Sequence, residues 1–131
     1  MHWIDIGCNL GHESFERDRH EVVQRALDAG VAQLVLTGAS VSGSERARDL
    51  AAENPARMRA TAGVHPHLAA EVDETALTRL KALHALDLVA AVGECGLDYF
   101  RDISPRPAQQ RAFERQLGLA EGCGKPVFLH Q

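Results

Sequence analysis

Short apolar segments alternate with amphipathic helical patterns along the whole of this 131-residue chain. Apolar residues three and four positions apart predict a helix between each pair of these segments. The alternation indicates an α/β fold whose sheet is mostly parallel, with right-handed crossover connections. The apolar segments predict five strands, at Trp3–Leu10, Val31–Thr37, Met58–Val64, Leu88–Glu94 and Lys125–His130.

Two kinds of pattern place the four helices. Asp18 and Ser42 each precede a glutamate by three residues, which is the capping-box spacing, and they predict where the first two helices begin. In the fourth helix, Phe113, Leu117 and Ala120 share one face, which predicts the side that packs on the sheet.

This alternation leaves two parallel architectures open. An open doubly wound sheet of five strands would be complete at this length, and its flavodoxin-like version has the strand order 2-1-3-4-5. A (β/α)₈ barrel of the TIM type usually needs about 250 residues, so this chain would supply roughly half of one. No break in composition marks a second domain, and residues 1–131 are predicted to form a single α/β domain.

Composition excludes several classes of protein. The net charge of −4 argues against a basic protein that coats nucleic acid, although an enzyme can also contact phosphates through a metal ion. The three cysteines form no CxxC pair, and their odd number argues against a disulfide framework, which favours a reduced, cytoplasmic setting. The sequence contains neither an apolar run of 18 residues nor an initial signal peptide, so no membrane association is expected.

Polar residues collect at the carboxyl-terminal ends of the predicted strands. Asn9 lies at the end of the first strand, His65 follows the third, and His130 ends the fifth. Glu94 ends the fourth strand, and Asp98 follows it closely. Both parallel architectures place their sites at these strand ends. Imidazole and carboxylate groups from neighbouring strands suit a divalent metal ion that holds a phosphoryl oxygen and activates water, so the pattern predicts a metal-dependent site.

Other catalytic motifs are weak. The glycines around Glu94 do not form the GxGxxG pattern of dinucleotide-binding folds, and the chain has no GxxxxGK[ST] loop. Cys95 is an alternative nucleophile, but no feature of the sequence lowers its pKa or selects it. Arg101 lies close enough to the predicted site to contact a phosphate.

Four motifs carry the polar residues: DIGCNL at 5–10, AGVHPH at 62–67, GECGLDY at 93–99 and PVFLH at 126–130. In order and spacing these motifs resemble the TatD-type metal-dependent nuclease family, within the amidohydrolase-like TIM barrels. The resemblance implies a divalent-metal phosphodiesterase, a hydrolase that trims the 3′ ends of single-stranded DNA or RNA. The predicted cofactor is Mg²⁺, with Mn²⁺ or Zn²⁺ as alternatives.

The resemblance also implies roles for individual residues. Glu94 matches the metal-bridging glutamate, His130 matches the metal histidine that ends the fifth strand, and His65 matches a pocket histidine near the scissile phosphate. We therefore predict catalytic roles for His65 and Glu94 and metal ligation by Glu94 and His130. Substrate contacts are predicted for Asn9, His65 and Asp98.

The chain departs from the family pattern in two ways. Gly7 and Asn9 stand where most members have a metal-binding histidine pair, as in the subgroup of the bacterial enzyme that gives the family its name. The family's barrel is also about twice as long, and its metal ligands after strands six and eight have no counterpart here. The resemblance thus implies a barrel truncated to about five strands and four helices, with exposed edges that self-association would cover. A non-enzymatic half-barrel that binds a partner or a metal is the alternative.

Overall fold

Five parallel strands form one sheet, in the order β1-β2-β3-β4-β5, in the computed structural model of the chain, which describes residues 2–131. Every neighbouring pair is parallel. The sequential order is that of a barrel wall, so the flavodoxin-like order 2-1-3-4-5 is wrong and the TIM-barrel type of α/β fold is confirmed. The strands are β1 (Trp3–Cys8), β2 (Val31–Leu36), β3 (Met58–Ala62), β4 (Val89–Gly96) and β5 (Val127–His130).

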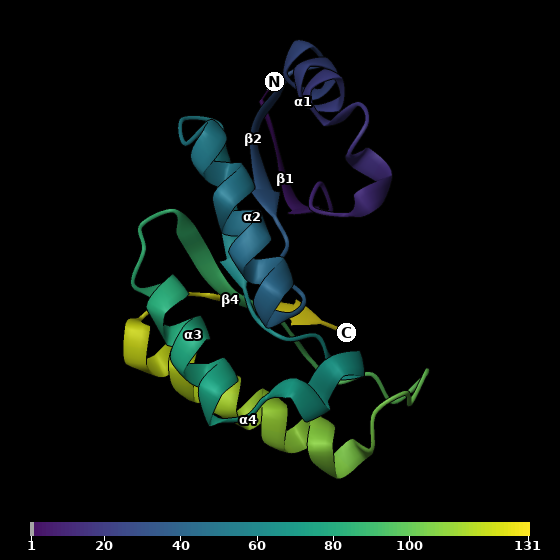
Figure 1. Ribbon diagram of the computed structural model, residues 1–131, viewed down its shortest axis with the longest axis vertical. Coiled ribbons are helices and arrows are strands. Elements are labelled where there is room, and N and C mark those ends of the chain that lie inside the picture. The colour runs from purple at the N-terminus through teal and green to yellow at the C-terminus, as the bar shows by residue number, and fades with distance from the viewer. Residues whose placement is uncertain (1) are drawn as a thin grey trace.

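The described residues also form four α-helices, one between each pair of consecutive strands. In Figure 1, α1 lies at the β1–β2 end of the molecule, whereas α3 and α4 lie side by side at the other end. No helix in residues 2–131 combines the length and the apolar character needed to cross a membrane. The helices are α1 (Arg19–Asp28), α2 (Val41–Glu53), α3 (Glu74–His84) and α4 (Arg106–Cys123), with 3₁₀ turns η1 (Glu13–Phe15) and η2 (Pro66–Glu71).

The two capping predictions are wrong in detail. The N-cap of α2 is Ser40, whose extended backbone lets its Oγ accept a hydrogen bond from the N–H of Gly43 at 2.9 Å. Ser42 lies inside the first turn of that helix instead. Asp18 does stand at the N-cap of α1, but its side chain makes no capping hydrogen bond.

The core lies between the helices and one side of the sheet. Small residues on α2 and α3, such as Ala47 and Ala76, let the helices approach the strands closely. The first strand has no such cover, since Trp3, Ile4 and Ile6 are 57–61% exposed. The larger apolar side chains of the core include Leu10, Leu34, Leu36, Met58, Leu80 and Leu83.

The buried face of α4 differs from the predicted one, because it carries glutamines. Gln109 and Gln116 are 0% and 1% exposed, whereas Leu117 is 39% exposed. The carboxamide of Gln116 accepts the N–H of Val64 at 2.8 Å and donates to the Val64 carbonyl at 3.0 Å. The helix therefore binds the backbone that leaves β3, immediately before His65, through a fully buried polar contact.

Replacing Gln116 by leucine is expected to lower the free energy of unfolding by about 2–4 kcal/mol, because it leaves two buried backbone groups of Val64 without partners. Urea denaturation followed by circular dichroism measures the change. The matched control is Gln110→Leu, at an exposed position of the same helix, which should change stability by less than about 0.5 kcal/mol. Equal stability of the two variants would contradict this account of α4.

Candidate functional site

The carboxyl-terminal ends of β3 and β4 come unusually close together, because glycines face each other there. A Cβ atom on Gly63 would lie 2.4 Å from the Cα of Gly93, which no side chain can tolerate. Gly93 itself has φ +129° and lies against the carbonyl of Phe128 on β5. This approach brings the residues that follow the three strands into one cluster.

His65, Glu94 and His130 form that cluster. The ligand atoms of these three half-buried side chains lie within 4.8 Å of one another. His130 Nδ1 lies 2.8 Å from Glu94 Oε1 and 3.0 Å from His65 Nε2, while His65 Nε2 and Glu94 Oε1 are 3.8 Å apart. Burial, reinforced by the neighbouring His130, lowers the pKa of His65, so its ring is neutral at pH 7.

Hydrogen-bond partners bear on where each imidazole carries its proton. His65 Nδ1 accepts the N–H of His67 at 3.1 Å, so the neutral ring carries its proton on Nε2, which faces His130 Nδ1. Both nitrogens of His130 face carboxylates, Nε2 that of Asp98 at 3.2 Å and Nδ1 that of Glu94 at 2.8 Å. In the tautomer with its proton on Nε2, the Nδ1 lone pair accepts the N–H of His65 and lies beside Glu94.

In that tautomer two lone-pair donors, His130 Nδ1 and Glu94 Oε1, face each other at 2.8 Å with no proton of their own between them. A cation satisfies such a pair, and two ligands side by side on one ion, with bonds of about 2.0–2.2 Å, are separated by about 3 Å. The residues therefore fit a divalent metal ion. An ion on His130 Nδ1 would take the lone pair that accepts the N–H of His65, which would leave that N–H free for an anionic oxygen.

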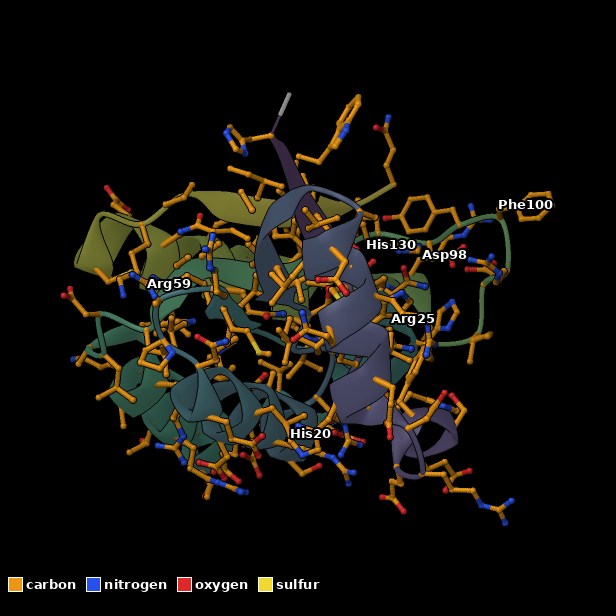
Figure 2. All side chains as sticks on the ribbon, turned by 90° about the horizontal axis from the view of Figure 1, so that it is seen from above. His20, Arg25, Arg59, Asp98, Phe100 and His130 are labelled. Atoms are coloured by element: carbon orange, nitrogen blue, oxygen red, sulfur yellow. The ribbon has the colours of Figure 1, made fainter. Side chains whose placement is uncertain are left out.

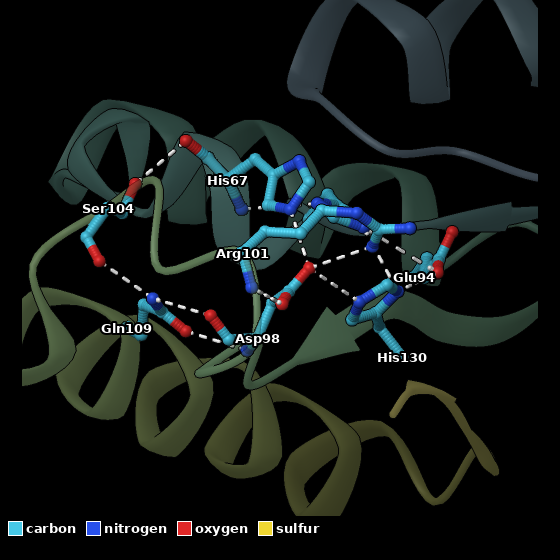
Figure 3. A network of polar contacts seen from close by, with 8 residues as sticks. His67, Glu94, Asp98, Arg101, Ser104, Gln109 and His130 are labelled. Atoms are coloured by element: carbon cyan, nitrogen blue, oxygen red, sulfur yellow. Dashed lines mark hydrogen bonds and ion pairs between the residues drawn. The ribbon is translucent and has the colours of Figure 1, made fainter.

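Asp98 connects this pair to a second set of polar residues, shown in Figure 3. Its side chain is 3% exposed and accepts hydrogen bonds from His67 Nε2 at 2.6 Å, Arg101 Nη1 at 3.0 Å and His130 Nε2 at 3.2 Å. The backbone N–H of Arg101, followed by these side chains, lowers the pKa of Asp98 well below its usual range. An ionised, acceptor-only carboxylate next to a metal-ligand histidine fixes the orientation of that ring.

The loop that carries Asp98 is held at several points. Gln109 of α4 accepts the N–H of Asp98 at 2.7 Å and donates to the carbonyl of Ser104 at 2.7 Å. The hydroxyl of Ser104 donates to the carbonyl of His67 at 2.7 Å. The segment after β4 and the start of η2 are therefore one hydrogen-bonded unit (Figure 3).

The structure brings four of the five predicted site residues together and leaves the fifth apart. His65, Glu94, Asp98 and His130 share one network. Asn9 lies just beyond β1, is exposed, and makes no side-chain hydrogen bond to this network among the described residues. His67 was not among the predicted site residues, although its place in the motif HPH was the available signal.

Cys95 does not suit the alternative role of a nucleophile. Its side chain is fully buried, and burial, with the nearby Glu94, raises the pKa of its thiol to about 12. All three cysteines are free, as the sequence predicts.

Comparisons with known proteins agree with this geometry. A family model described as TatD related DNase matches residues 4–131. The chain is 46% identical to the 3′-5′ ssDNA/RNA exonuclease TatD of Erwinia billingiae, over 97% of this chain and 49% of that protein. It is 47% identical to the protein of the same name from Enterobacter lignolyticus, over 97% of this chain and 48% of that protein. The chain therefore spans about half the length of the curated relatives it matches.

Solved structures show the same relation. The crystal structure of YjjV, a TatD homolog from Escherichia coli, superposes with a TM-score of 0.87 at 32% identity, over 98% of this chain and 50% of that one. A hydrolase TatD family protein from Entamoeba histolytica superposes with a TM-score of 0.90 at 27% identity, over 100% of this chain and 50% of that one.

Replacing Asp98 by asparagine is expected to weaken divalent-metal binding by roughly 10- to 100-fold, because the amide no longer fixes the proton of His130 on Nε2. Isothermal titration with Mn²⁺ or Zn²⁺ measures the affinity. Asp102→Asn, in the same loop but paired with Arg106 at the surface, is the control and should bind metal like the unaltered chain. Unchanged affinity in Asp98→Asn would show that Asp98 does not support the ligands.

Proposed function

The chain belongs to the family of TatD-related DNases, and from this premise we propose that it acts as a divalent-metal-dependent phosphodiesterase. The proposed substrate is the 3′ end of single-stranded DNA or RNA, which the names of the curated relatives state for those proteins. The observation that carries the proposal is the pair of ligand atoms Glu94 Oε1 and His130 Nδ1, 2.8 Å apart and beside His65 Nε2.

In this proposal each residue has one task. Glu94 and His130 hold the ion, and Asp98 keeps His130 in the tautomer that presents Nδ1. A bound divalent ion lowers the pKa of a water ligand and polarises a phosphoryl oxygen. His65 Nε2–H donates to a non-bridging oxygen of the scissile phosphate and stabilises the charge that grows there.

The identity of the ion stays a prediction. Mg²⁺ is the ion we predict, and the imidazole ligand of this pair also suits Mn²⁺ and Zn²⁺. Asn9 is proposed to contact the substrate from the exposed end of β1, and Asp98 to act on the substrate through Arg101. We also propose that the chain is located in the cytoplasm, as its cysteines predict.

A second candidate function follows from the coverage of the relatives. The chain matches 49% of the Erwinia protein, and a half-barrel that binds a metal or a partner without hydrolysis is consistent with that share. Metal uptake without cleavage would favour this alternative.

In the presence of Mg²⁺ or Mn²⁺, the chain is expected to shorten a 5′-labelled single strand from its 3′ end. Glu94→Ala should reduce the rate to the level measured with EDTA, because it removes one of the two facing ligands. Denaturing gel electrophoresis resolves the products. Glu114→Ala, at an exposed position of α4, is the control and should cleave normally. Equal rates for Glu94→Ala and Glu114→Ala would contradict the proposed site.

We also propose that a second copy of the chain covers β1. The backbone of this edge strand has a partner on one side only, and Trp3, Ile4 and Ile6 are more than half exposed. Exposed, apolar edge strands pair readily with another strand.

Sedimentation equilibrium is therefore expected to give a mass above the 14.2 kDa of one chain, and Ile6→Lys should return it to that value. The control is Leu86→Lys, at a residue 38% exposed outside β1, which should leave the mass of the assembly unchanged. A monodisperse monomer that unfolds cooperatively would rule out this association.

A further inference from the structure

The loop after β4 carries apolar side chains that the proposed chemistry does not use. Phe100 is 96% exposed, Ile103 is 61% exposed and Tyr99 is 36% exposed. Three exposed apolar residues within five positions are unusual in a loop, because turns and loops are normally polar. They lie only one to five residues after the buried carboxylate of Asp98.

This exposure does not come from a loosely held loop. The N–H of Arg101 donates to the Asp98 carboxylate at 2.9 Å, and the N–H of Asp102 donates to the Asp98 carbonyl at 3.1 Å. The guanidinium of Arg106 pairs with Asp102 at 3.1 Å and lies over the ring of Tyr99, 4.6 Å from its centre. The backbone on both sides of Phe100 is therefore fixed, and the ring is presented to solvent from a rigid support.

The position of Phe100 relates it to the candidate metal centre. Figure 2 shows Asp98 and His130 close together, with Phe100 farther out on the same loop and pointing away from the body of the molecule. The loop thus runs from the candidate metal centre outward to this ring.

We propose that Phe100 is a stacking platform for a nucleobase of the single strand whose end enters the site. Aromatic rings in single-strand-binding proteins stack on bases of any sequence, because every base has a π-face. This inference rests on the proposed function, since it takes its ligand from the substrate proposed above.

The neighbouring charges favour a nucleic acid as the occupant. Arg101 is 56% exposed and bonds the Asp98 carboxylate through Nη1, and its guanidinium has no other partner in residues 2–131, so its other N–H groups can contact a phosphate. Arg106, the first residue of α4, is 55% exposed. An aromatic ring next to an arginine that is anchored by a buried carboxylate can bind one base and one phosphate of the same strand.

Binding without cleavage provides the test. A fluorescein-labelled oligothymidylate is titrated with the 131-residue chain in EDTA, and the anisotropy gives Kd. Phe100→Ala should raise Kd by roughly 5- to 150-fold, and Phe100→Trp should restore it, because tryptophan also stacks. Leu117→Ala, which removes an exposed apolar side chain from α4, is the control and should leave Kd unchanged.

An abasic strand of equal length separates stacking from other contacts. The unaltered chain and Phe100→Ala should bind it equally, because it offers phosphates and no bases. An unchanged Kd in Phe100→Ala with oligothymidylate, a penalty that persists on the abasic strand, or no binding by the unaltered chain would each overturn the proposal.

Cleavage measurements keep this inference apart from the proposed function. If Phe100 stacks a base, Phe100→Ala should raise KM for a single strand while kcat stays within about twofold. Phe100-dependent binding by a chain that never cleaves would leave the stacking platform standing and refute the phosphodiesterase. Cleavage with the same KM in Phe100→Ala as in the unaltered chain would support the phosphodiesterase and refute the stacking platform.

Discussion

The contact between the backbones of Gly63 and Gly93 determines how the rest of the site is arranged. A Cβ on Gly63 would overlap the backbone of Gly93, and a Cβ on Gly93 would overlap the carbonyl of Phe128 on β5. The N–H of Glu94 also donates to the carbonyl of Gly38 at 2.7 Å, across the end of β3. The ends of β2, β3 and β4 therefore converge, and a carboxylate on β4 comes within reach of a histidine that follows β3 and another that ends β5.

Convergence of the strand ends alone would crowd several hydrogen-bond acceptors together at a cost in free energy, and Asp98 offsets this cost. Its carboxylate faces His130 Nε2 and favours the tautomer with the proton there, which leaves Nδ1 as a ligand, and it also accepts hydrogen bonds from His67 and Arg101. Since Gln109 holds the backbone of Asp98 from α4, a buried amide on a helix fixes the orientation of an imidazole on a strand. The metal pair, the loop and the helix are thus mechanically one unit, which gives the exposed loop the rigidity that base stacking requires.

The sequence predicts the order of strands and helices behind this arrangement, because that order depends on the periodicity of the apolar residues. Parallel strands put their carboxyl ends at one edge, so His65, Glu94 and His130 could be expected to meet from their positions alone. The buried Gln109 and Gln116 were not predicted, because a glutamine on a helix has no apolar signal and gains its place only from a tertiary partner. The N-cap of α2 is likewise Ser40 rather than Ser42, because Ser40 is the residue whose backbone is still extended just before the helix begins.

Both the metal pair and its support lie on the part of the chain from β3 to β5, whereas β1 contributes no described contact to them. The strand β4, which carries Glu94, is covered by α3 and α4, while β1 exposes Trp3 and Ile6. Metal binding and the positioning of the nucleic-acid substrate consequently depend on different parts of this fold. The ligand pair can form wherever β3, β4 and β5 are folded, but a residue such as Asn9 reaches a substrate only if its exposed strand is held in place. Any activity of the chain would then depend on what covers β1, even though no ligand of the metal pair lies on that strand.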